Sequence, residues 1–308
     1  MSTVCPSVQR RSRAVIRTAA LLVGVTCSLA ASNPAAAQNV VSAPAWAQNQ
    51  PPVRGFYATP TVNLRVFVPT GRVRIGVWDR DSIMVSGTIG AASSMFGGGR
   101  ADYVKFGVAP LRTDDPNLAE ADWLVTVPRR AHVWVKMTVG SIETDSTEGE
   151  LELYAVGGSI SVRRASGVVS VESIDAGVRI DGVRGDLRIR AGKAVTAIND
   201  ATGTASVTSV SGGVTLSGRT PECRVETIGG DIVFDASQLS GAVAELQTHS
   251  GTIRVGIDDR RPPLLELSSR SGRVSKISSS GIAANGRVVA RSFRGAVTIE
   301  ASPPRRMR

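Results

Sequence analysis

The chain has 308 residues, of which 42% are hydrophobic but only 4% are aromatic, and it contains 32 glycines. This length allows one large or two small domains, and the shortage of aromatic residues indicates a thin core filled by Val, Ile and Leu. The formal net charge is +10. A positive surface would favour anionic envelope polymers, lipid headgroups or nucleic acid without selecting among them, and solubility alone is the simpler explanation of the charge. Nucleic-acid binding would require basic residues interleaved with aromatic ones, and the export signal described next argues against it.

Residues 1–37 have the features of a secretory signal peptide. Four arginines precede an apolar stretch from Thr18 to Ala31, and Ala35-Ala36-Ala37 forms a small-residue cleavage site. The alternative is an uncleaved membrane anchor, but the apolar stretch is shorter than the ~20 residues that a spanning helix needs. We therefore expect an exported protein, periplasmic or at the cell surface, with no transmembrane span after cleavage. Its mature chain would carry 32 basic residues against 26 acidic ones.

The rest of the chain divides by composition. Residues 38–60 are rich in Ala, Gln, Asn and Pro, which is typical of a linker. From residue 61 apolar and polar residues alternate, so we expect an N-terminal β segment over 61–130 that leads into repeats over 131–300. Within the first segment, the glycine-rich stretch Ser93 to Arg100 is expected to be a flexible loop. Residues 301–308 form a basic C-terminal tail.

The repeats are defined by apolar residues that recur every 18 positions between Ile142 and Phe234. Such a fixed period is typical of repeat architectures, in which each unit buries its apolar face against its neighbours. Two columns of the repeat are Ile142, Ile160, Val178, Thr196, Val214 and Ile232, and Thr144, Val162, Ile180, Ile198, Leu216 and Phe234. Half a period away lie Leu151, Val169, Leu187, Ala205 and Cys223, and Leu153, Val171, Ile189, Val207 and Val225.

Each half-period reads Gly, any residue, apolar, any residue, apolar, as in Gly149-Glu-Leu-Glu-Leu and Gly158-Ser-Ile-Ser-Val. The alternation predicts a strand with one buried face, and the glycine predicts a corner. The sequence therefore predicts an all-β fold, a β-solenoid with about 18 residues per coil and two short strands per coil. Residues one period apart would then stack at about 4.8 Å. An antiparallel meander with hairpins every half-period is the alternative.

The polar positions agree with this stacking. Glu172 falls in the same column as Arg190, and no two adjacent members of a second outward column carry the same charge. That second column contains Glu152, Ser170, Arg188, Ser206 and Arg224. After Phe234 the pattern continues at wider intervals, and insertions such as Asp258 to Pro263 are expected to form loops at the corners.

No catalytic, cofactor-binding or metal-binding residue is predicted, and no cofactor. The acidic doublets Asp114-Asp115 and Asp258-Asp259 each lie beside a proline in an expected loop, which favours a turn over catalysis. The histidines His132 and His249 are far apart and lack metal-ligand spacing or a nucleophile motif. Cys223 lies in an inward column, which favours a small buried hydrophobe over a reactive thiol.

Three sets of motifs resemble the bacterial putative adhesin domain family. They are Gly71-Arg-Val-Arg-Ile-Gly-Val-Trp-Asp-Arg-Asp-Ser-Ile, then Leu124-Val-Thr-Val-Pro128, and then the recurring Gly-x-apolar-x-apolar units, together spanning about Val62 to Ile299. The resemblance implies a β-solenoid domain of exported or membrane-associated proteins, a family whose function is largely unknown. It carries over no catalytic or binding residues.

These observations favour a non-enzymatic cell-envelope or surface protein, an adhesin-like binding or structural module. Its partner would be envelope polysaccharide or another envelope protein, and not nucleic acid. Two alternatives stay open. A polysaccharide-active β-helix enzyme would need charged groups that converge on one outer face, and an envelope-stress scaffold would act through a protein partner.

Overall fold

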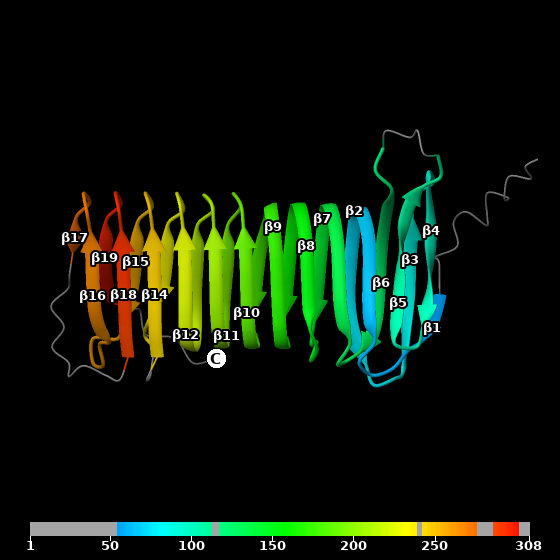
Figure 1. The fold of residues 1–308 in the computed structure, drawn as a ribbon, viewed down its shortest axis with the longest axis horizontal. Coiled ribbons are helices and arrows are strands. Elements are labelled where there is room, and N and C mark those ends of the chain that lie inside the picture. The colour runs from blue at the N-terminus through cyan, green and yellow to red at the C-terminus, as the bar shows by residue number, and fades with distance from the viewer. Residues whose placement is uncertain (1–53, 113–116, 239–241, 276–285, 302–308) are drawn as a thin grey trace, which may run out of the picture. The chain divides into compact units, whose positions relative to one another are not determined.

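The computed structural model describes residues 54–112, 117–238, 242–275 and 286–301. These residues form an all-β structure whose nineteen strands belong to one mostly parallel sheet, and they include no helix (Figure 1). In the described part of the chain, therefore, no helix long and apolar enough to cross a membrane is found. The predicted signal peptide at 1–37 and nearly all of the tail at 301–308 lie outside the described residues.

The strands before the repeats are β1 (Arg54–Tyr57), β2 (Asn63–Trp78), β3 (Ser82–Ile89), β4 (Ser93–Arg100), β5 (Tyr103–Pro110) and β6 (Glu120–Pro128). One edge of β2 pairs in parallel with β7, while its other edge pairs in parallel with β5 and then with β6. The pairs β1–β3, β3–β6 and β4–β5 are antiparallel. β1 lies within 38–60, the segment that the sequence predicted as a linker.

The prediction of a flexible loop from Ser93 to Arg100 is wrong, because these residues form β4. The strand pairs with β5 along its whole length, from Ser93 opposite Pro110 to Arg100 opposite Tyr103. Glycine weakens a strand but does not exclude one, above all where another group approaches the backbone closely. Here a Cβ at Gly97 would collide with Phe106. The Gly-rich sequence therefore reflects close packing.

The strands of the regular repeats are β7 (His132–Asp145), β8 (Leu151–Arg163), β9 (Ser166–Asp181), β10 (Arg184–Ala191), β11 (Thr196–Ser209) and β12 (Val214–Thr227). They pair in parallel, which excludes the antiparallel meander, and Figure 1 shows their arrows side by side. Paired residues lie a full period apart, except at a register shift between β11 and β12: Val162 pairs with Ile180, and Ile180 with Ile198. All three side chains are fully buried. The predicted inward columns are therefore confirmed at these positions.

Several strands are longer than predicted, because one strand can cover both halves of a repeat (the half-units) where two short strands were expected. β8 continues through both half-units, because Gly140 stays paired with Gly158 while the chain bends there. Gly158 has a φ of 101°, and a Cβ at this position would collide with the carbonyl oxygen of Gly140. A glycine thus turns the corner without interrupting the hydrogen-bonded ladder. The chain leaves the ladder instead at the other corner, at residues such as Arg164, with a φ of 50°.

The last strands are β13 (Ile232–Asp235), β14 (Ala242–Thr248), β15 (Ile253–Ile257), β16 (Leu264–Ser269), β17 (Val274–Ser275), β18 (Gly286–Ser292) and β19 (Val297–Ala301). They do not stack in sequence order. β18 pairs in parallel with β14 on one edge and with β16 on the other, and β19 lies in the same way between β15 and β17. Figure 1 shows the red β18 between the yellow β14 and the orange β16. The C-terminal coil is therefore inserted between the two coils that precede it.

The core is mostly aliphatic, as the composition predicted, but its N-terminal part is aromatic. The ring of Phe106 stacks on Phe56 at 5.8 Å and meets the edge of Trp123 at 5.5 Å, between ring centroids. Cys223 is buried in the repeat core, where loss of solvation raises the pKa of its thiol to about 12. The thiol is therefore kept neutral.

Candidate functional site

Side chains on the outward surface of β5, β2, β7 and β8 gather around a group of aromatic rings. We call these aromatic rings, together with the basic side chains around them, the aromatic face. Its residues are Tyr103, Lys105, Arg65, Phe67, Trp134, Lys136 and Tyr154. Parallel pairing places Arg65 between Lys105 and Trp134, and Lys136 between Phe67 and Tyr154. The alternation of inward and outward residues thus brings together side chains that lie up to about 90 residues apart in sequence.

Rings and cations are in direct contact on this face. The ring centroids of Phe67 and Trp134 are 4.8 Å apart, and the guanidinium of Arg65 lies 5.7 Å from the Trp134 ring and 6.0 Å from the Tyr103 ring. Each of two lysine ammonium groups covers one ring: Lys105 lies 4.9 Å from Phe67, and Lys136 lies 5.1 Å from Tyr154. Cation–π contacts of this kind hold long side chains in place, so positive charges stand at fixed points above a flat apolar surface.

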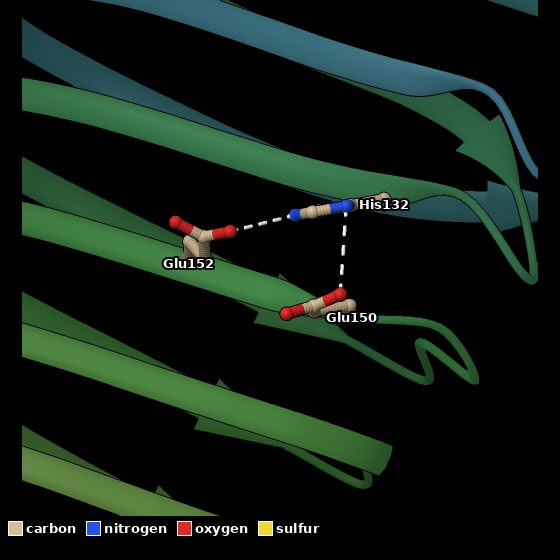
Figure 2. Close-up of side chains that lie close together, drawn as sticks. All are labelled: His132, Glu150 and Glu152. Carbon is tan, nitrogen blue, oxygen red and sulfur yellow. Dashed lines mark hydrogen bonds and ion pairs between the residues drawn. The ribbon is translucent and has the colours of Figure 1, made fainter. Parts of the chain in front are cut away.

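A second group adjoins the aromatic face at the start of β7 and β8. His132 lies between two glutamates: its Nε2 is 2.8 Å from Oε1 of Glu152, and its Nδ1 is 3.5 Å from Oε2 of Glu150 (Figure 2). The side chains are 30%, 41% and 45% exposed for His132, Glu152 and Glu150. Among the described residues this is the group of His, Cys, Asp and Glu side chains placed to hold a metal ion.

The repeat explains how the His–Glu group forms. His132 and Glu150 are separated by one full repeat period, so they occupy the same position on successive coils. Glu150 and Glu152 flank the buried Leu151 and therefore point to the same side of the strand. Backbone hydrogen bonds fix both coils here, from Val133 N to Glu150 O at 2.8 Å and from His132 N to Val62 O at 2.9 Å. The sequence carried this signal in its repeat period, although no site was predicted from it.

The other sequence candidates lie elsewhere. His249 stacks on Phe293 with ring centroids 4.8 Å apart, far along the ladder from His132. Asp258 shapes a turn, because its carboxylate accepts a hydrogen bond of 3.0 Å from the backbone N–H of Arg260, and Asp259 is exposed beside it. Asp114 and Asp115 lie outside the described residues. The structure therefore places His249, Asp258 and Asp259 away from the aromatic face.

Two grooves follow the corners of the coils. One, of about 530 Å³, is lined by the exposed apolar residues Val210, Ile228 and Phe293, which occupy equivalent positions after β11, β12 and β18. The other, of about 570 Å³, lies beyond the ends of β7, β8 and β9. Its charged lining residues are Arg129, Arg164, Arg184, Arg219, Glu148 and Asp200. Because acids are interspersed and Arg164 already pairs with Asp145 at 2.6 Å, this second groove is a mixed-charge surface.

No protein-family model matches the chain, and no curated protein matches it. Two similar solved structures are a putative adhesin from Bacteroides fragilis, 11% identical with a TM-score of 0.44, and a putative cell adhesion protein from Clostridium sporogenes, 9% identical with a TM-score of 0.26. Each alignment covers 82% of this chain, and 98% and 100% of the respective neighbour. Similarity at this level carries no functional inference for this chain.

Proposed function

We propose that this protein is an exported, non-enzymatic module of the cell envelope or cell surface, in which a β-solenoid presents a binding face to envelope polysaccharide. The predicted signal peptide supports export. The pairing of residues one period apart along β7 to β12 supports a solenoid with one repeat unit per coil. Stacked coils of this kind hold rows of outward side chains about 4.8 Å apart on a rigid surface.

The aromatic face carries this proposal. Aromatic side chains supply large, rigid, amphipathic contact area at a low cost in conformational entropy, which suits the mixed CH and hydroxyl surface of a sugar ring. Arg65, Lys105 and Lys136 stand over the rings and can contact the carboxylate or phosphate groups of an anionic polymer. A strand-borne face also needs little reorganisation when it binds. These features favour an adhesin-like binding module, in agreement with the resemblance of the sequence motifs to the putative adhesin domain family.

The test is a binding assay on the protein purified as the cell exports it. It is incubated with envelope polysaccharide, with lipid vesicles and with envelope extract, and sugar release is measured in parallel. We expect the polysaccharide to be retained without release. Trp134→Ala should weaken retention at least about tenfold, about 1.4 kcal/mol, as expected for a central aromatic contact. Phe293→Ala, which removes a ring at the corner groove, is the matched control and should bind as the unmodified protein does.

Three results would overturn the proposal. If the unmodified protein releases sugar, and Glu150→Gln or Asp258→Asn abolishes this release, the protein is a polysaccharide-active enzyme. Capture of one envelope protein without polysaccharide would identify a scaffold that acts through a partner. Equal losses in Trp134→Ala and Phe293→Ala would show that the aromatic face is not the site of contact. Circular dichroism of each variant checks that the fold is kept.

A further inference from the structure

The His–Glu group combines an imidazole and two carboxylates, side chains of the kinds that bind metal ions. A neutral imidazole carries one N–H and can donate to one carboxylate only, so its other nitrogen presents a lone pair to the second carboxylate. In the structure both ring nitrogens face a glutamate oxygen. Among the described residues, His132 is also the one group that forms an ion pair with Glu150 or Glu152. Two carboxylates therefore share at most one positive charge.

We propose that His132, Glu150 and Glu152 bind a divalent transition-metal ion of the Zn²⁺ type. With a metal bound, one imidazole nitrogen and an oxygen of each carboxylate all act as ligands. The ion also supplies two positive charges, which match the two negative charges of the carboxylates. Imidazole and carboxylate are the ligands that Zn²⁺ accepts besides thiolate.

The geometry suits such an ion. One nitrogen or oxygen atom of each residue lies within 4.8 Å of those of the other two. Ligands bound to Zn²⁺ at about 2.0–2.2 Å in a tetrahedron stand roughly 3.3–3.6 Å from one another, so the widest separation in the group must close by no more than about 1.5 Å. The half-exposed glutamate side chains can make this movement, while the backbone hydrogen bonds of Val133 and His132 keep the strands fixed.

Three protein ligands leave a fourth position on a tetrahedral ion. This position faces solvent, because all three side chains are partly exposed on the outward surface. Glu152 pairs with Trp134, so the ion would lie beside the aromatic face. The metal site does not depend on the proposed polysaccharide binding, since its ligands are on the chain itself.

Metal binding is measured by calorimetric titration of ZnCl₂ into tag-free, chelator-treated protein at pH 7.5. We expect one equivalent to bind. His132→Gln, Glu150→Gln and Glu152→Gln should each weaken binding at least about tenfold, since even residues that only orient a metal ligand contribute 10–100-fold. His249→Gln removes the other histidine and is the matched control; it should bind as the unmodified protein does. Co²⁺ should give the absorption bands of a four-coordinate ion, and these should disappear in His132→Gln.

The proposal is overturned if no stoichiometric binding occurs, or if His132→Gln binds Zn²⁺ as tightly as His249→Gln does. The first result would mean that the three side chains contact one another without holding an ion. The second would place the ion at other residues. Trp134→Ala should leave Zn²⁺ binding unchanged, so a failure of the metal proposal can be told apart from a failure of the proposed function.

Discussion

Leu246 pairs with Ala290, far along the chain, and not with Leu267 of the coil that follows it. Leu267 pairs with the other side of Ala290. The chain therefore leaves room for one coil between β14–β15 and β16–β17. The strands β18 and β19, which come later in the sequence, occupy that position. Among the described strands, β16 and β17 each pair with one neighbour, whereas β18 and β19 each pair with two.

This order predicts an unusual pattern of amide hydrogen exchange. We expect peptides from β18 and β19 to be better protected than peptides from β16 and β17, although β18 and β19 lie closer to the C-terminus. The reason is that amides in a strand paired on both edges open less often than those in an edge strand. Exchange followed by mass spectrometry measures both regions in one experiment. Faster exchange in β18 than in β16 would contradict the inserted position of the C-terminal coil.

The core of the repeats makes a second prediction. Ile180 is fully buried between Val162 and Ile198, so Ile180→Ala should lower the free energy of unfolding by about 2–5 kcal/mol. The adjacent Arg179 is outward, and its ion pair with Asp181 at 2.8 Å is exposed. Arg179→Gln should therefore cost no more than about 1 kcal/mol. Urea unfolding of the two variants compares them, and similar losses would show that the inward and outward positions are misassigned.

The sequence predicted the middle of the fold well, because the repeat period fixes which residues are neighbours. Glu172 does pair with Arg190, and Arg188 with Ser170 and Ser206, as the charge pattern indicated. The same period relates His132 to Glu150, but the pair lies before the apolar columns begin. A search of outward positions for residues one period apart would have found it.

Other features depend on contacts that a local pattern does not encode. The local sequence pattern does not show which strand Val288 pairs with. In the structure it pairs with Ala244 on one edge of β18 and with Leu265 on the other. Glycine was expected to mark every corner, yet Arg164 adopts a left-handed φ of 50°. Its guanidinium binds Asp145 at 2.6 Å, an interaction between successive coils that accompanies this conformation. The aromatic face likewise requires the pairing of β2 with β7, two strands that are distant in sequence.

The third prediction concerns Gly157 and Gly158, two adjacent glycines at the corner between the half-units of β8. Gly158→Ala would place a methyl group against the Gly140 carbonyl at a φ of 101°, and we expect it to destabilise the protein by at least about 1–3 kcal/mol. At Gly157 a Cβ would lie 3.7 Å from a methyl group of Val139, an ordinary contact. Gly157→Ala should therefore be close to neutral. Thermal unfolding of both variants tests the difference, and an equal loss of stability would show that Gly158 has no special role at the corner.

Cys223 provides a fourth prediction. Its thiol is buried and its pKa is raised to about 12 by loss of solvation, so almost no thiolate is present at pH 8. We expect the folded protein to react with a thiol-specific reagent such as DTNB only after urea unfolds it. Rapid reaction in buffer would mean that the coil around Cys223 opens readily. Cys223→Ala, which removes a buried sulfur, is the control for reaction at any other site.

Acid stability supplies the fifth prediction, based on Asp181 in β9. Burial raises the pKa of its carboxyl group, but hydrogen bonds from Asn199 and Arg179, both at 2.8 Å, and the positive charges of Arg179 and Arg163 lower it by more. Its pKa in the folded protein therefore lies below the usual 3.8. Because the unfolded chain takes up the proton more readily, the ionised carboxylate stabilises the fold above about pH 4, and this stabilisation is lost as the pH falls through the folded pKa.

Asp181→Asn keeps the shape of the side chain and removes its charge. We expect the melting temperature of this variant to lie below that of the unmodified protein by a constant amount between pH 5 and 7. Below about pH 4 the difference should shrink, because the unmodified protein then loses the contribution that the variant never had. Asp259→Asn, at an exposed turn, is the control and should melt with the unmodified protein at every pH. A difference for Asp181→Asn that stays constant down to pH 2 would show that the carboxylate stabilises the fold through its shape and neutral hydrogen bonds, and not through its charge.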